Sequence, residues 1–115
     1  MEEGFFALYY TGVAGTGFGL FILSRGIITG VDVGGGTYDG DYRVDQAAGT
    51  LDGELKFNVP PGLPLVTGHP AQANSFTLSI PLKLPVNLGG EKPLTVQTPT
   101  GPVNVVVKKL RDLPA

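Results

Sequence analysis

The clearest pattern along the chain is an alternation of apolar and polar residues. In segment 50–59, Leu51 and Phe57 belong to a row of apolar residues and one glycine, and every intervening position is polar or charged. A period of two residues is typical of a β-strand with one face on a core and the other in water. Segments 37–45 and 75–81 alternate in the same way. The middle of the chain is therefore predicted to form one-sided strands.

The first third of the chain is apolar on both sides of its predicted strands. Segments 4–11 and 18–25 carry aromatic or aliphatic residues at successive positions, and a third strand is predicted over 27–33. Strands that are apolar on both faces are usually covered on both faces. We therefore expect one side of these strands to face the core and the other side to be covered by a partner.

Glycine and proline are spread along the whole chain, with 18 and 10 copies in 115 residues, and they interrupt helical periodicity. Short connections join sequential strands as antiparallel neighbours, and a meander of this kind can close and remove its edges. We predict one all-β domain (1–115), an eight-stranded antiparallel meander β-barrel of lipocalin-like form, with a β-sandwich as the alternative. The predicted strands are 4–11, 18–25, 27–33, 37–45, 50–59, 75–81, 94–98 and 102–109.

Two longer links, 60–74 and 82–93, contain several prolines. The first is expected either to hold a short helical turn or to act as a lid over one mouth of the barrel.

Alternation divides the apolar side chains between inside and outside, but it does not decide which face of the first three strands points inward. Exposed apolar patches larger than a few hundred Å² usually mark interfaces. Such an outer surface would form the contact with a second copy of the chain or with another partner. We assign to it Phe6, Leu8, Tyr10, Phe21 and Leu23. The predicted barrel interior consists of Phe5, Ala7, Tyr9, Tyr38, Tyr42, Leu55, Phe57, Phe76, Leu78 and Ile80.

Charge and composition exclude several classes of function. The formal net charge of −2 provides no basic field for a phosphate backbone, so nucleic-acid binding is not expected. The chain has no cysteine, which excludes disulfides, cysteine-zinc sites and thiol nucleophiles. Its first residues are acidic where a signal peptide is basic, and its longest weakly polar run is too short to span a membrane. We expect a cytoplasmic protein with no membrane span.

The glycine-rich segments 12–17 and 34–36 suggest phosphate loops, but neither is followed by Gly-Lys-Ser/Thr or by a predicted helix. We interpret both as turns between strands. His69 is the only histidine, and no nearby serine pairs with it as a nucleophile. It is predicted to have no catalytic role.

Asp39 and Asp41 share one face of a predicted strand, with Asp32 and Asp45 nearby. Carboxylates can bind a hard cation, but the spacing of a calcium loop is absent. We interpret them as a solvated strand face. With no catalytic, cofactor or metal site identified, the chain is predicted not to be an enzyme.

Three motifs are similar to those of the GrlR-type negative regulators of type III secretion, a bacterial family. They are 4–7 (Gly-Phe-Phe-Ala), 28–35 (Ile-Thr-Gly-Val-Asp-Val-Gly-Gly) and 38–42 (Tyr-Asp-Gly-Asp-Tyr), and the likeness covers roughly residues 4–59. The resemblance implies a lipocalin-like eight-stranded barrel and a homodimer. The acidic Glu-Asp-Glu-Asp stretch with which these regulators bind an activator protein has no counterpart in 44–52. The resemblance therefore does not extend to that partner.

These observations favour a non-enzymatic, homodimeric interaction or regulatory module that acts through an outward apolar face of the first three strands. The alternative is a carrier of a small apolar or lipid-like ligand, because a barrel of eight strands either fills its interior or leaves room for one ligand. A third hypothesis, an enzyme, would require polar groups clustered inside the barrel.

Overall fold

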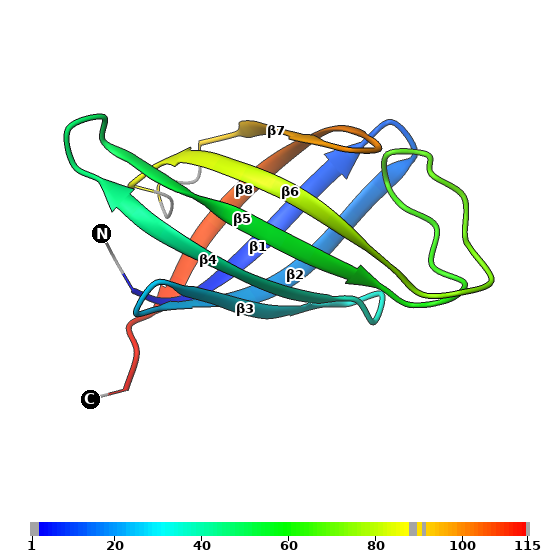
Figure 1. Ribbon diagram of the computed structural model, residues 1–115, viewed down its shortest axis with the longest axis horizontal. Coiled ribbons are helices and arrows are strands. Elements are labelled where there is room, and N and C mark those ends of the chain that lie inside the picture. Colours follow the sequence, from blue (N-terminus) through cyan, green and yellow to red (C-terminus); the bar gives the residue numbers. More distant parts are fainter. Residues whose placement is uncertain (1–2, 88–89, 91, 115) are drawn as a thin grey trace.

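Eight β-strands form the regular structure of the protein in a computed structural model, which describes residues 3–87, 90 and 92–114 (Figure 1). Figure 1 shows the strands wrapping around a common axis, with the first and last described residues at the same end of the barrel. The strands are β1 (Gly4–Gly12), β2 (Gly15–Ser24), β3 (Ile27–Asp32), β4 (Thr37–Asp45), β5 (Thr50–Val59), β6 (Phe76–Pro85), β7 (Leu94–Thr98) and β8 (Gly101–Arg111).

All eight strands belong to one antiparallel sheet with the order β6-β5-β4-β3-β2-β1-β8-β7. Sequential strands are neighbours from β1 to β6 and again from β7 to β8, and the pairing of β1 with β8 joins the two parts. Among the described residues no ladder connects β6 to β7, so the barrel is nearly closed. The predicted meander barrel is confirmed, and the β-sandwich alternative is wrong.

Four of the strands extend further than the sequence predicts: β1 and β8 by one or two residues at an end, and β2 and β6 by three or four. β2 begins at Gly15 rather than at 18, because the turn between β1 and β2 is tight and Gly12 pairs with Gly15. β6 runs to Pro85, although it contains prolines that cannot donate to a ladder. Proline is tolerated here because β6 is an edge of the sheet.

Glycines on the inner face allow neighbouring strands to approach each other where the sheet curls. A Cβ at Gly40 would lie 2.3 Å from the backbone oxygen of Glu54, and one at Gly53 would lie 2.1 Å from that of Asp41. Any larger residue would push β4 and β5 apart. These two positions therefore contribute to the curvature that brings the sheet round on itself.

The side of β1 and β2 that points into the barrel is the opposite of the side that we assigned to the interior. Phe6 and Leu23 are fully buried in the core, Phe6 stacks on Phe21 with ring centroids 5.2 Å apart, and Leu8 packs against the same cluster. Tyr10 also points inward, toward Asp32. These five residues (Phe6, Leu8, Tyr10, Phe21 and Leu23) form part of the interior, and their predicted role as a partner surface is wrong.

The residues that we placed inside on β1 lie on the outer face instead. Tyr9 is 47% exposed, and the ring of Phe5 lies 5.9 Å from the Arg111 guanidinium. Ala7 is itself buried, but it lies opposite Lys108 of β8. Lys108 and Asn104 belong to an exposed row of β8, whereas the row opposite Leu8 and Tyr10 carries the buried Val107 and Val105. The pattern along β8 thus decides which side of β1 points inward, a choice that alternation within β1 leaves open.

Candidate functional site

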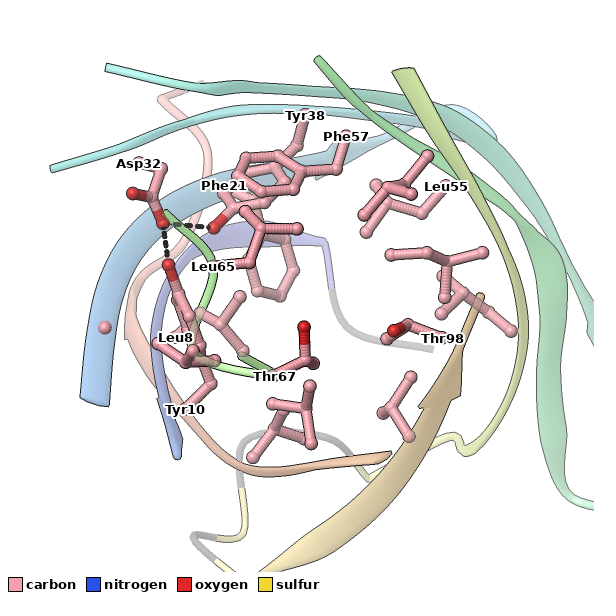
Figure 2. Close-up of a pocket in the computed structure, with 18 of the residues that line it drawn as sticks. Leu8, Tyr10, Phe21, Asp32, Tyr38, Leu55, Phe57, Leu65, Thr67 and Thr98 are labelled. Atoms are coloured by element: carbon pink, nitrogen blue, oxygen red, sulfur yellow. Dashed lines mark hydrogen bonds between the residues drawn. The ribbon is translucent and has the colours of Figure 1, made fainter. Parts of the chain in front are cut away.

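A cavity of about 270 Å³ lies inside the barrel (Figure 2). Every strand contributes at least one side chain to its wall, and most of these side chains are apolar. Small-molecule sites in proteins are concave, mostly apolar and furnished with a few convergent polar groups. The apolar wall includes Leu8, Phe21, Leu23, Ile28, Leu51, Leu55, Phe57, Leu78, Ile80, Leu82, Leu84, Val96, Val103, Val105 and Val107.

The link between β5 and β6 covers one mouth of this cavity. Its residues 63–67 line the cavity, and Leu63 and Leu65 pack against the core cluster around Phe57. The link is tied to the turn between β1 and β2, because the backbone N–H of Ala14 donates to Val66 O at 2.7 Å. It contains no helical turn. Of the two roles predicted for this link, the structure shows the covering segment and not the helix.

A buried carboxylate lies in the cavity wall at the same end of the barrel. Asp32 is 7% exposed and accepts three hydrogen bonds. The Tyr38 hydroxyl donates to Oδ2 at 2.7 Å, the Tyr10 hydroxyl donates to the same oxygen, and the Gly34 N–H donates to Oδ1 at 2.8 Å. Figure 2 shows both phenol oxygens reaching the Asp32 carboxylate at one wall. We call these residues (Tyr10, Asp32 and Tyr38) the Asp32 cluster.

Two glycines of β2 make room for the rings of the Asp32 cluster. Gly17 is paired with Tyr10, and a Cβ at this position would lie 2.1 Å from Tyr10 Cζ. A Cβ at Gly19 would lie 2.8 Å from the Tyr38 ring. Since real Cβ atoms do not approach other atoms so closely, the rings lie where they do only because side chains are missing beneath them.

The environment of the Asp32 cluster keeps its two phenols protonated. Burial raises the pKa of Tyr38 far above its ordinary value, and the hydrogen bond to Asp32 raises it further. Burial is also the largest cause of the raised pKa of Tyr10, followed by its hydrogen bond to Asp32. Burial raises the pKa of Tyr42 as well. The hydroxyls of Tyr10 and Tyr38 therefore remain donors to Asp32 well into the alkaline range.

Three threonines of the cavity wall form a second polar group, and Figure 2 shows one of them, Thr98, across the cavity from Asp32. Thr98 Oγ1 donates to Gly101 O at 2.7 Å and lies 3.3 Å from Thr100 Oγ1, which in turn lies 2.9 Å from Thr67 Oγ1. This threonine chain connects the covering link to the turn between β7 and β8. It closes the mouth by hydrogen bonds rather than by apolar contacts alone.

The other predicted interior residues all lie on the inner side of the sheet. Tyr38, Leu55, Phe57, Leu78 and Ile80 line the cavity, and Tyr42 and Phe76 pack against the two core clusters. His69 lies edge-on against the Phe76 ring, with the centroids 5.4 Å apart. His69 therefore has a packing role.

Sequence reasoning missed the Asp32 cluster. Asp32 was grouped with Asp39 and Asp41 as a solvated acidic face, but only the last two are exposed. The signal was present in the sequence, because Asp32 lies between two valines at the end of a strand that is apolar on both sides. Its tyrosine partners could not be identified without the register of β1, β3 and β4.

The outer face of β1–β3 remains apolar where it is exposed to solvent. Leu20 lies opposite Val31, and the two side chains are 41% and 56% exposed. Tyr9 and Ile27 are also exposed on this side. We call these four residues (Tyr9, Leu20, Ile27 and Val31) the outer patch. The predicted exposed apolar surface on the first three strands is present, but other residues form it.

Within the described ranges no group of three or more potential metal ligands occurs, and no helix there is long and apolar enough to cross a membrane. No protein-family model matches the chain, and no curated protein is significantly similar to it. The resemblance to the GrlR-type regulators is therefore supported at the level of the eight-stranded barrel and not at the level of family membership.

Proposed function

We propose that the protein binds one small, largely apolar molecule inside its barrel and acts by carrying or sensing it. The observation that supports this most strongly is the cavity of about 270 Å³, with an apolar wall drawn from all eight strands. Well-packed interiors contain few voids larger than a water molecule. A space of this size is therefore better explained by a ligand than by imperfect packing.

The size of the cavity limits the ligand. A water molecule occupies about 30 Å³ in the liquid, so 270 Å³ corresponds to roughly ten non-hydrogen atoms. Ligand sites usually span about 300–1,000 Å³, which places this cavity near the lower end. The expected ligand is a short aliphatic or a bicyclic molecule rather than a long-chain lipid.

We further propose that binding proceeds without catalysis. The polar groups of the wall are bonded to one another: both phenols donate to Asp32, and the threonine chain ends on a backbone carbonyl. Among the described lining residues there is no histidine, lysine or arginine to act as an acid or base. Such a wall is suited to holding a molecule and offers no activated nucleophile.

Naphthalene, a rigid hydrocarbon of about the right size, is a suitable probe of the cavity. We expect it to bind the wild-type protein with one-to-one stoichiometry. Leu55→Trp fills the cavity with an indole and should abolish binding, because Leu55 lines the space directly (Figure 2). Leu20→Trp places the same side chain on the outer patch and should leave binding unchanged.

Circular dichroism establishes that both variants fold, and titration followed by naphthalene fluorescence gives the affinities. Equal naphthalene binding by the wild type and Leu55→Trp would rule out the cavity as the binding site.

A second candidate function, self-association through the outer patch, is supported by the exposure of Leu20 and Val31 side by side. Neighbouring exposed apolar side chains are characteristic of interfaces. The resemblance to the GrlR-type regulators implies a homodimer, and a stable contact typically buries about 800 Å² per partner. The two functions are compatible, because the cavity and the outer patch lie on opposite faces of the same strands.

Sedimentation analysis tests this second function. We expect a dimer for the wild type and a monomer for the double variant Leu20→Asp, Val31→Asp, with naphthalene binding retained in both. A monomeric wild type at micromolar concentration would contradict it.

A further inference from the structure

The hydroxyl hydrogens around the cavity are almost all directed into the protein. The phenols of Tyr10 and Tyr38 both donate to Asp32 Oδ2. A carboxylate only accepts hydrogen bonds, so neither phenol can reverse its direction. Each phenol oxygen therefore turns acceptor capacity, and not a hydrogen, toward the cavity.

The hydroxyl hydrogens of the threonine chain are also donated to acceptors within the protein. Because Thr98 Oγ1 donates its single hydrogen to Gly101 O, its contact with Thr100 requires the Thr100 hydroxyl to donate. The Thr100 hydrogen is then used, so the contact with Thr67 requires Thr67 to donate. The remaining lining hydroxyl, Thr16, is exposed at the strand end. The described side chains deep in the cavity thus offer a ligand acceptors only.

The charge of the cavity wall also favours a ligand that donates hydrogen bonds. Asp32 is the one acidic residue among the described lining residues, and none of them is lysine, arginine or histidine. Oδ1 accepts from the Gly34 N–H in the turn after β3, whereas Oδ2 accepts from the two phenols, which line the cavity with Asp32. A ligand carboxylate here would meet like charge and no donor, while an ammonium would meet acceptors and opposite charge.

We propose that the ligand of this cavity is a small apolar amine whose ammonium group binds at the Asp32 cluster. This inference rests on the proposed ligand-binding function and specifies its chemical class. The apolar body fills the space between Leu8 and Leu55, and the ammonium group donates to the phenol oxygens beside the Asp32 carboxylate. Primary aliphatic amines are protonated at neutral pH, since their pKa is close to that of a lysine side chain, about 10.4.

The test compares nonylamine, nonanol and nonanoic acid, which share one alkyl chain and differ in the head group. Isothermal titration calorimetry at pH 7 measures each against the wild type. A hydrogen bond that involves a charged group contributes roughly tenfold or more in affinity, so we expect the amine to bind at least about tenfold tighter than the alcohol. The acid should bind most weakly. Equal affinities for amine and alcohol, or the tightest binding by the acid, would overturn the proposal.

Asp32→Asn removes the charge with almost no change in shape and should reduce the preference for the amine to less than about threefold. Asp41→Asn is the matched control, because it removes the same charge from an exposed position of β4, and it should keep the full preference. An unchanged preference in Asp32→Asn would overturn the proposal. If that variant does not fold, the wild-type series alone decides.

Naphthalene binding separates this inference from the function on which it rests. If naphthalene binds and the amine shows no preference, the head-group assignment is wrong and the cavity function stands. If neither naphthalene nor any member of the series binds, both fail together.

Discussion

The two faces of β1 and β2 have nearly the same apolar composition but different surroundings. The inner face carries Phe6 and Leu23, each 1% exposed, and it continues into the Asp32 cluster. The outer face carries Tyr9 and Leu20, which are exposed to solvent. Apolar character is therefore insufficient to distinguish a core face from a surface face in these strands.

The difference between the faces lies in small and polar residues. On the inner side, Gly17 and Gly19 lie beneath tyrosine rings, and Asp32 has donors for both of its oxygens. On β8, the row that pairs with the outer side carries the exposed Asn104 and Lys108, whereas the row that pairs with the inner side carries buried valines. Glycines on β2 and the alternation of valines with polar residues on β8 decide which side points inward, because they specify where space and solvent are needed.

The largest effect that separates the two faces is expected from a matched pair of leucines on β2. Leu23→Ala should lower the free energy of unfolding by about 2–5 kcal/mol, because it leaves a void in the buried core. Leu20→Ala, at a position 41% exposed, should cost less than about 1 kcal/mol. Urea denaturation measures both. Similar losses in the two variants would show that the assigned facing is incorrect.

A smaller effect is expected from adding a methyl group to the inner face. Gly17→Ala should displace the Tyr10 ring from Asp32 and cost about 1–3 kcal/mol, the range for a broken buried hydrogen bond. In a Tyr10→Ala background the same substitution should cost close to nothing, since the conflicting ring is absent. A double-mutant cycle of unfolding free energies measures the coupling. Equal costs in both backgrounds would remove the steric explanation.

The smallest effect concerns alkaline pH. The pKa of Tyr38 is raised in the folded state above the value of 10.0 for a free tyrosine. Above pH 10 the folded protein binds more protons than the unfolded chain, so stability falls as the pH rises, by up to about 1.4 kcal/mol per pH unit for this group. Tyr38→Phe should flatten this decline. Unfolding free energies measured between pH 9 and pH 11 test it, and parallel declines in the two proteins would refute it.

Much of the fold follows from the sequence alone. Alternation in β4, β5 and β6, together with regularly spaced glycines, predicts the strands and their meander order, because these features depend on neighbours along the chain. The facing of β1 and β2 does not follow, since both faces are apolar and the deciding residues lie on β8.

The Asp32 cluster is the least predictable part of the molecule. Its residues come from β1, β3 and β4, and their proximity depends on a register that spans the sheet. Asp32 alone carried a sequence signal, as a charged residue within an apolar strand. That pattern predicts burial with hydrogen-bond partners, but it does not say which residues supply them.

The most direct test of the central claim is to locate a bound hydrocarbon by nuclear Overhauser contacts in the wild-type protein. Naphthalene should show contacts to the methyl groups of Leu8, Leu55 and Leu82, which line the cavity. Contacts confined to Leu20 and Val31 of the outer patch would contradict the account, because they would place the ligand on the outside of the barrel.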